Sequence, residues 1–256
     1  MTLGQRQFDG RHMVDVAIDR IREFCPPEGY YVAFSGGKDS IVVKHLVQRA
    51  GVLHDLHYHV TTVDPPELLQ YIREHHPDVQ WDRPNETMWQ LIARKRMPPT
   101  RMVRYCCEEL KEVGGRDRFV ITGVRWAESV RRATRGMFET CKRVSTRRFV
   151  NPIIDWSNGD VWDYIKSNGL PYCCLYDEGF DRLGCIMCPM AGKRRHLDAV
   201  RWPQYARAYK RAMDKMVAKR IADGLPTEWK DGQDAYDWWM NDPKQAKEAV
   251  GCQLFE

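Results

Sequence analysis

A short glycine-containing segment between an apolar strand and an apolar helix has the composition of a binding site. It is SGGKDS, residues 35–40, and it follows the buried-strand pattern of residues 30–34. Glycines let the backbone turn tightly, and a helix N-terminus offers free N–H donors and the positive end of its dipole. A surface turn is the competing interpretation, but the apolar strand and helix on either side favour a phosphate site with a mobile cation. We predict that it consists of Ser35, Gly36, Gly37, Lys38, Asp39 and Ser40.

Four of the nine cysteines form two pairs that could ligate a metal. Cys106 and Cys107 are adjacent, whereas Cys185 and Cys188 form a C-x-x-C motif that a proline follows. Four thiolates can bind a tetrahedral zinc ion or a 4Fe–4S cluster. Zinc ribbons typically use two C-x-x-C knuckles, which an adjacent pair does not provide. The pattern therefore favours a 4Fe–4S cluster, with buried thiols and no metal as the second interpretation and zinc as the third.

Polar residues at the ends of other predicted strands complete the candidate site. Asp64 follows the second strand and is a candidate to bind ribose hydroxyls or Mg²⁺. Gly123 ends the fourth strand, where a missing side chain lets the backbone approach a ligand. Arg125 and Arg132 offer planar donor forks for phosphate or sulfate, and Glu128 is the predicted orienting group. Taken singly, each arginine is typical of a surface ion pair, and only its position at a strand end favours binding.

The elements that must position these residues alternate between strands and helices. Strands are predicted at residues 30–34, 56–60, 79–81, 118–123 and 150–154. Helical patterns separate them, which implies right-handed crossovers and ligand binding beyond the carboxyl ends of the strands. The predicted fold is α/β, a three-layer α/β/α arrangement with a mostly parallel five-stranded sheet and a C-terminal helical segment. Residues 1–190 are expected to form the nucleotide-binding domain with the cluster cysteines, and residues 191–256 a helical extension.

Length and composition are those of a globular protein. The chain has 256 residues, of which 43% are hydrophobic, and its formal net charge is +5. No apolar run approaches the roughly 20 residues of a membrane span, and the first ten residues lack the apolar core of a signal peptide. We therefore expect a cytoplasmic protein with no membrane partner. In such reducing surroundings, clustered cysteines indicate metal or redox chemistry.

The charge is unevenly distributed along the chain. Residues 191–220 carry ten Lys or Arg against two Asp, and residues 116–148 carry ten Lys or Arg against three acids. Residues 221–256 carry three Lys against eight acids. Such blocks favour an anionic ligand or partner, and a solvated helix face is the competing interpretation. If a nucleic acid binds, we expect residues 193–195 to contribute most, because they follow the second cysteine pair closely.

The loop resembles the signature of PP-loop ATP pyrophosphatases, which share the adenine-nucleotide α-hydrolase fold. Four further segments are similar to the iron–sulfur branch that contains phosphoadenylylsulfate (PAPS) and adenylylsulfate reductases: VDPPE (63–67), YCCEELK (105–111), TGVRWAES (122–129) and the run from NPIIDW to RLGCIMCP (151–189). The resemblance implies that the loop binds the pyrophosphate that leaves ATP when a nucleophile attacks the α-phosphorus. It also implies that the four paired cysteines are the cluster ligand set.

Three functions are compatible with these features. The first is an ATP-dependent enzyme that adenylates an acceptor in sulfur transfer, similar to PP-loop proteins of DNA phosphorothioation and tRNA thiolation. The second is a PAPS or adenylylsulfate reductase, in which the tail residue Cys252 attacks the sulfate sulfur. The third is a non-catalytic nucleotide- or nucleic-acid-binding subunit. The intact SGGKDS loop favours ATP, whereas Cys252 and the cysteine pairs favour the reductase; a tail thiol without a role is the competing interpretation of Cys252.

These hypotheses assign roles to particular residues and partners. Lys38, Asp39, Arg125 and Cys252 are the predicted catalytic residues. The expected cofactors are a 4Fe–4S cluster, Mg²⁺ and an adenine nucleotide, which is ATP or else PAPS or adenylylsulfate. The expected partners are a sulfur donor such as a cysteine desulfurase, or thioredoxin, and a nucleic-acid acceptor.

Overall fold

The computed structural model describes residues 12–140 and 146–241, and the chain divides into two compact units. The sheet unit comprises Met1–His59, Pro66–Asp82 and Gly114–Leu183. The helical unit comprises Val60–Pro65, Arg83–Val113 and Gly184–Glu256. This division differs from the predicted boundary at residue 190, because residues 83–113 contribute a helix that packs against the C-terminal helices.

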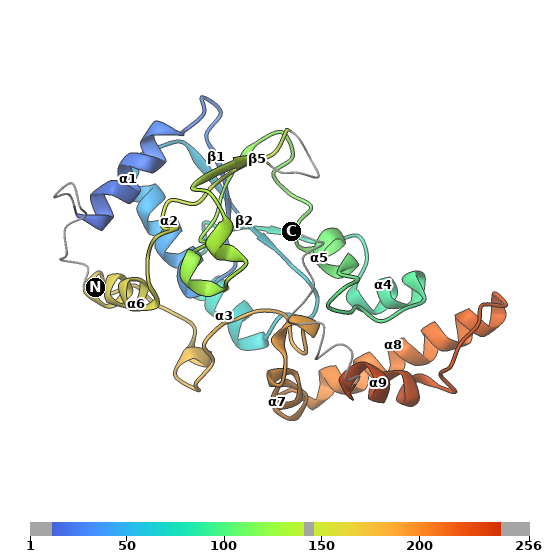
Figure 1. Cartoon of the computed structure of the whole chain (residues 1–256). Helices are drawn as coiled ribbons and strands as arrows, with labels where there is room; N and C mark the ends of the chain where they lie inside the picture. Colours follow the sequence, from blue (N-terminus) through green and yellow to red (C-terminus); the bar gives the residue numbers. More distant parts are fainter. Residues whose placement is uncertain (1–11, 141–145, 242–256) are drawn as a thin grey trace. The chain divides into compact units, whose positions relative to one another are not determined.

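The sheet unit contains a β-sheet, of which β1, β2 and β5 are labelled in Figure 1. The strand order in the sheet is β3-β2-β1-β4-β6-β5. Its strands are β1 (Tyr30–Ala33), β2 (His54–His59), β3 (Gln80–Asp82), β4 (Phe119–Ile121), β5 (Phe138–Thr140) and β6 (Arg148–Val150). Neighbouring strands are parallel except β5 and β6, which are antiparallel. The predicted α/β class with a mostly parallel sheet is confirmed.

Within residues 12–140 and 146–241, the sheet has six strands rather than the predicted five. The additional strand is β5, a three-residue edge strand whose Phe138 pairs with Val150 of β6. A strand this short carries no alternating pattern that the sequence could show. The strand predicted at 150–154 ends at Val150, because the chain turns there and the Ile154 N–H donates to the Asn151 carbonyl at 3.2 Å.

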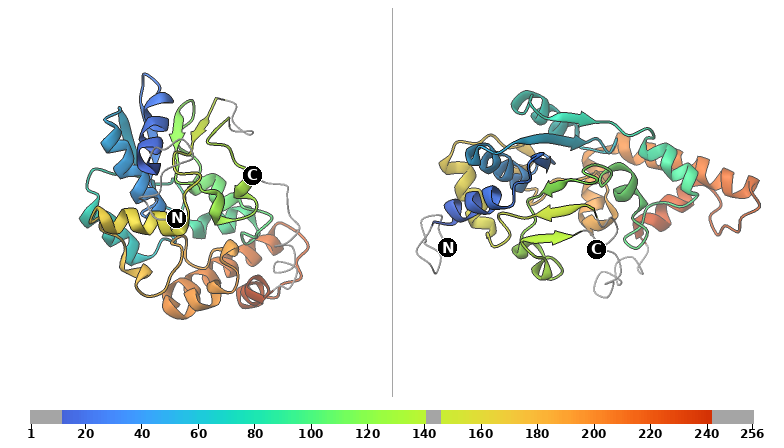
Figure 2. Two further views of the ribbon diagram at one scale, coloured as in Figure 1. Left: turned by 60° about the vertical axis from the view of Figure 1, so that its left-hand side comes forward. Right: turned by 90° about the horizontal axis from the view of Figure 1, so that it is seen from above.

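Helices fill most of the connections between the strands. The α-helices are α1 (Met13–Glu23), α2 (Lys38–Ala50), α3 (Pro66–His75), α4 (Met88–Lys95), α5 (Tyr105–Leu110), α6 (Asn158–Ser167), α7 (Arg194–Arg201), α8 (Pro203–Ala222) and α9 (Gly232–Asn241). Short 3₁₀ turns are η1 (Trp126–Glu128), η2 (Arg132–Thr134), η3 (Cys174–Tyr176) and η4 (Pro189–Ala191). In the sheet unit α2 packs between α1 and α6 (Figure 2). Across the described residues, no helix has both the length and the apolar character that a membrane crossing requires.

The helical unit is built around α8, which α4 and α9 contact. The rings of Tyr209 in α8 and Trp239 in α9 lie 4.7 Å apart between centroids. Trp239 is fully buried, and its indole N–H donates to the Pro99 carbonyl at 2.6 Å. These contacts tie residues of the central chain to the C-terminal helices, and they confirm the predicted C-terminal helical segment.

Candidate functional site

The predicted phosphate loop lies between β1 and α2 in the sheet unit. β1 ends at Ala33 and α2 begins at Lys38, so SGGKDS forms the turn and the first residues of the helix. Gly36 has a φ of 70°. A Cβ atom at Gly36 would lie 2.7 Å from Leu68 Cδ1 and 2.8 Å from Ile72 Cδ1. The backbone conformation and the contact with α3 therefore both require glycine here.

Substituting Gly36 with alanine tests this requirement, and Gly51 provides a matched control. Gly51 ends α2 with a φ of 69°, and no atom lies within 4 Å of the position of its Cβ. Gly51→Ala should cost about 1–2 kcal/mol from the left-handed backbone alone. Gly36→Ala should cost a further ~1–3 kcal/mol from overpacking. Urea unfolding measures both, and equal losses would contradict the tight contact with α3.

The loop closes on itself and leaves backbone donors unused. The Ser40 hydroxyl donates to the Gly37 carbonyl at 2.8 Å and accepts from the Ser35 N–H at 3.2 Å. Within the described residues, the N–H groups of Gly36, Gly37 and Asp39 have no hydrogen-bond partner. Unpaired donors at a helix N-terminus form an anion site, and the α2 dipole adds to its positive potential.

Tyr176 contacts the start of α2, a role that no motif around this residue indicates. The Lys38 N–H donates to the Tyr176 hydroxyl at 2.9 Å, a contact between residues 138 positions apart. The Tyr176 ring packs edge-on against Trp162, with 5.0 Å between centroids. Burial and the nearby Asp39 raise the pKa of Tyr176, so its hydroxyl keeps its proton. That proton is available to donate to an anion bound at the loop.

The charged residues of the site form a chain of ion pairs. Asp39 accepts from Lys38 Nζ at 3.0 Å and from Arg125 Nε at 2.7 Å. Arg125 is 0% exposed, and its two terminal nitrogens donate to the Trp156 carbonyl at 3.0 Å and to Asn158 Oδ1 at 2.7 Å. The donor fork of Arg125 is therefore used within the protein rather than presented to a ligand as the sequence analysis expected. Its geometry is that of a residue that positions Asp39 and, through Asp39, Lys38.

The end of β4 brings further predicted residues to the loop. A Cβ atom at Gly123 would lie 2.9 Å from the Asp39 carbonyl carbon, so glycine permits close contact with the protein backbone of α2. Glu128 accepts from the Arg125 N–H at 2.9 Å and forms an ion pair with Arg132. The Arg132 side chain is 32% exposed. Of the two predicted arginines, it is Arg132 that remains accessible to a ligand.

Asp64 lies in the helical unit and closes a local turn. Its two carboxylate oxygens accept from the N–H and the hydroxyl of Thr61, both at 2.7 Å. Its backbone carbonyl accepts from the Tyr205 hydroxyl at 3.1 Å. The side chain is thus buried and engaged with the protein. A role of Asp64 toward ribose or Mg²⁺ stays a prediction.

All four paired cysteines lie in the helical unit. Cys106 and Cys107 begin α5, and Cys185 and Cys188 flank the turn before η4, where the Cys188 N–H donates to the Cys185 carbonyl at 3.2 Å. The hydrogen bond to Cys107 and burial raise the pKa of Cys106, and the charges of Cys185 and Cys188 raise it further. The two pairs therefore lie in the same unit and act on one another electrostatically. Cys252, the predicted nucleophile, lies outside the described residues.

Cationic groups adjoin these thiols. A hydrogen bond from Cys106 lowers the pKa of Cys107 to about 6, although burial acts in the opposite direction. Arg104 lowers this pKa further, because its guanidinium lies 3.7 Å from the Cys107 sulfur. Burial raises the pKa of Cys185 to about 12. Arg195 is 5% exposed, and its Nε and one terminal nitrogen lack a hydrogen-bond partner in the part of the chain that the structure describes. In that part, no three Cys, His, Asp or Glu side chains are arranged to hold a single metal ion.

A buried histidine connects the helices that flank the loop. His76 Nδ1 lies 2.9 Å from Lys44 Nζ, and Nε2 lies 2.8 Å from the Tyr71 hydroxyl. Because the Tyr71 hydroxyl donates its one proton to the Pro171 carbonyl at 2.7 Å, His76 Nε2 must donate to Tyr71 and Nδ1 must accept from Lys44. Burial and the Lys44 charge lower the pKa of His76 to about 4, and Asp78 opposes them only in part.

This histidine predicts a pH dependence of stability. Between pH 6.5 and about 4, the unfolded chain binds a proton at His76 and the folded protein does not. The free energy of unfolding should therefore decrease by roughly 3 kcal/mol as the pH falls through this range, and be unaffected by His76 above it. His76→Gln removes the titrating group, so urea unfolding of both proteins at several pH values isolates its contribution. Parallel pH profiles would contradict the neutral buried histidine.

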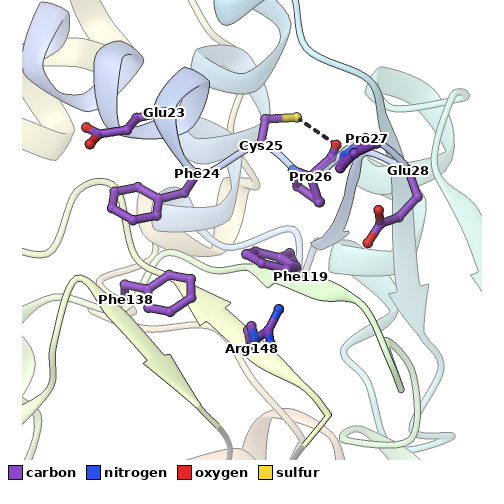
Figure 3. A pocket seen from close by; sticks show the side chains of 9 residues that line it. All are labelled: Glu23, Phe24, Cys25, Pro26, Pro27, Glu28, Phe119, Phe138 and Arg148. Atoms are coloured by element: carbon purple, nitrogen blue, oxygen red, sulfur yellow. Dashed lines mark hydrogen bonds between the residues drawn. The ribbon is translucent and has the colours of Figure 1, made fainter.

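A separate hollow of about 490 Å³ is lined by residues 23–28, which precede β1, together with Phe119, Phe138 and Arg148 (Figure 3). The loop follows the opposite, carboxyl end of β1. Phe24 stacks on Phe138 with 5.2 Å between centroids, and the Arg148 guanidinium lies 5.1 Å from the Phe119 ring centroid. None of the predicted site residues lines this hollow. The candidate site is therefore defined by the loop and its hydrogen bonds, not by this cavity.

Comparison with known proteins agrees with this fold. Residues 29–191 match the phosphoadenosine phosphosulfate reductase domain, and the match includes the loop, Arg125 and both cysteine pairs. The chain belongs to this protein family. Its fold is similar to that of the crystal structure of PAPS reductase from Candida auris in complex with phosphate, with a TM-score of 0.50 and 18% identity. That similarity covers 72% of this chain and 98% of the Candida auris chain.

Curated relatives share part of their length with this chain. An adenosine 5'-phosphosulfate reductase of Staphylococcus haemolyticus is 30% identical over 152 residues, which are 52% of this chain and 56% of that protein. An uncharacterized protein of Methanocaldococcus jannaschii is 33% identical over 171 residues, which are 62% of this chain and 35% of that protein. The chain thus spans between about a third and just over half of the length of these relatives.

Proposed function

We propose that this PAPS reductase-family protein binds ATP at residues 35–40, adenylates an acceptor and releases pyrophosphate in iron–sulfur-dependent sulfur transfer. The observation that carries the proposal is the loop itself, with unpaired N–H donors at Gly36 and Gly37 and the Lys38 ammonium in the same turn. A leaving pyrophosphate gains negative charge, which such preorganised donors stabilise. PAPS and adenylylsulfate have no β,γ-pyrophosphate that would use them.

The proposed reaction assigns roles to two residues of the loop and to two residues that contact it. A nucleophilic oxygen of the acceptor attacks the α-phosphorus, the bond from that phosphorus to the bridging oxygen breaks, and pyrophosphate leaves with the electron pair. The acceptor becomes an adenylate. Asp39 holds Lys38 at the loop, Arg125 holds Asp39, and Tyr176 donates a hydrogen bond to the bound phosphate. Mg²⁺ would enter with the phosphates of ATP.

We further propose that Cys106, Cys107, Cys185 and Cys188 ligate a 4Fe–4S cluster. Four thiols of one unit suit such a cluster. Cys107 has a lowered pKa, whereas metal binding would have to deprotonate Cys106 and Cys185, whose pKa values are raised. The buried Arg195 lacks partners for two of its nitrogens, as expected if an anionic group accepts from them. Bound there, the cluster would supply a site that carries sulfur.

A second candidate function is sulfonucleotide reduction. The family and the adenosine 5'-phosphosulfate reductase of Staphylococcus haemolyticus favour it. In this reaction the Cys252 thiolate would attack the sulfate sulfur of PAPS or adenylylsulfate, and the S–O bond to the nucleotide phosphate would break. A thiosulfonate would remain on the cysteine, and two electrons from thioredoxin would release sulfite. The first candidate would instead use a sulfur donor such as a cysteine desulfurase.

Product analysis separates the two candidates. Full-length protein purified without oxygen is incubated with ATP, and separately with adenylylsulfate or PAPS, each with and without a thiol reductant. Pyrophosphate released from ATP without a requirement for reductant is the expected result, and AMP accompanies it because water takes the place of the absent acceptor and attacks the α-phosphorus. Sulfite released from a sulfonucleotide only when reductant is present would replace our proposal with the reductase. If neither product forms, a non-catalytic nucleotide-binding role is indicated.

A further inference from the structure

The sequence predicts that residues 193–195 contribute most to nucleic-acid binding, and the structure shows where their side chains lie. Arg195 is buried, and its guanidinium lies 4.1 Å from the Trp239 ring centroid. Arg194 forms an ion pair with Asp198 at 3.8 Å. The expectation is therefore wrong for Arg195, because its side chain is buried within the helical unit and is not exposed to a nucleic acid. Of these three residues only Lys193 is exposed, so an extended basic surface of the helical unit needs further residues.

The basic side chains of α8 fall into two groups, one packed on aromatic rings and one exposed. Lys210 Nζ lies 4.8 Å from the Tyr236 ring centroid, and the Arg220 guanidinium lies 5.5 Å from that of Trp229. These two cations pack on aromatic rings of the same unit. The remaining four basic residues of α8, which we call the α8 stripe, are exposed: Arg207, Arg211, Lys215 and Lys219.

The members of the α8 stripe recur at every fourth position. They therefore share one helix face, with neighbours about 6 Å apart along the axis and a total length of about 18 Å. Nearby acids are engaged elsewhere, because Asp214 accepts from the Gly232 N–H at 2.7 Å and Asp223 pairs with Arg96 at 2.6 Å. Among residues 12–140 and 146–241, no side chain forms an ion pair with the stripe. Like charges at this spacing destabilise a helix, so folding does not explain the pattern.

We propose that the α8 stripe binds the phosphodiester backbone of a nucleic acid without reading its sequence. A line of evenly spaced cations suits a polymer that presents one charge per residue at regular intervals. Tyr205 and Tyr209, the aromatic residues of α8, have Trp89 as a ring neighbour and are not exposed for base stacking. The contact is therefore electrostatic. This inference stands independently of the nucleotide chemistry at the loop.

Binding of duplex DNA and of tRNA to the full-length protein, measured by fluorescence anisotropy at several salt concentrations, tests the proposal. Four phosphate contacts give a log–log salt slope of about −3.6 on duplex DNA. Arg211→Gln combined with Lys215→Gln should reduce that slope by about 2. The control, Arg116→Gln combined with Lys166→Gln, removes the same charge from exposed positions of the sheet unit and should leave the slope unchanged.

Several results would overturn the proposal. These are no binding of either polymer at low salt, equal slopes for the stripe variant and the wild type, or equal losses in both double variants. Polyaspartate of matched charge, added as a competitor, should displace the nucleic acid poorly. If it binds as tightly as DNA, the partner is an acidic polypeptide instead. The stripe variant should unfold at the same or a higher urea concentration than the wild type, because it removes like-charge repulsion.

Discussion

Lys38→Ala is expected to lower the rate of pyrophosphate release from ATP by about 10²–10³-fold, because in the proposed reaction the ammonium stabilises the charge that develops on the leaving group. The fold should remain, since alanine favours a helix and the Lys38 N–H still donates to Tyr176. The ion pair of Arg125 with Asp39, at 2.7 Å, does not involve Lys38 and should also persist. Initial rates of pyrophosphate formation, together with circular dichroism, measure both outcomes.

The control for this variant is Lys166→Ala, which removes an exposed lysine from α6 in the same unit. Its rate should match that of the wild type. Unchanged pyrophosphate release in Lys38→Ala would remove Lys38 from the mechanism and with it the ATP interpretation of the loop. An equal decrease of the rate in both variants would show that the rate depends on the net charge of the protein rather than on Lys38.

Cys107→Ser and Cys188→Ser should each cause the loss of bound iron. The broad absorbance at about 400 nm, which is typical of thiolate-ligated iron, should be lost with it. Each substitution removes one ligand of the proposed set, and a bound metal contributes folding free energy. We therefore expect the helical unit to lose stability together with the iron. Iron content and thermal unfolding of anaerobically purified protein provide the two measurements.

Cys174→Ser is the matched control for the cluster variants. Cys174 is exposed in η3 of the sheet unit and lies outside the two pairs. Its variant should retain iron and stability. Equal iron in all three variants, or none in the wild type, would contradict the cluster. A single zinc ion in the wild type, lost from both pair variants, would replace it with a zinc site.

The sequence predicts the parts of this site that depend on local pattern. SGGKDS between an apolar strand and an apolar helix specifies the turn, the start of α2 and the residues at the helix N-terminus. The parallel sheet follows from strands separated by helices. The glycine at position 36 is itself informative. Its φ of 70° and the closeness of Leu68 leave no room for a side chain at this position.

Contacts between distant segments are what the sequence does not predict. Tyr176 reaches the loop from 138 residues away, with no motif around it. Arg125 follows a strand end, as a ligand-binding arginine would. Its terminal nitrogens instead donate to Trp156 and Asn158, because the segment after β4 meets the start of α6. Arg195 belongs to a basic run, yet it is buried against Trp239. In each case tertiary packing decides between roles that the residue type leaves open.

The most direct test of the central claim, that the loop binds ATP, is equilibrium binding without turnover. Titration calorimetry on the full-length protein compares a non-cleavable α,β-methylene analogue of ATP with adenylylsulfate. We predict that the ATP analogue binds at least about tenfold more tightly, or about 1.4 kcal/mol, and that Lys38→Ala removes this difference. Tighter binding of adenylylsulfate, unaffected by Lys38→Ala, would contradict the account.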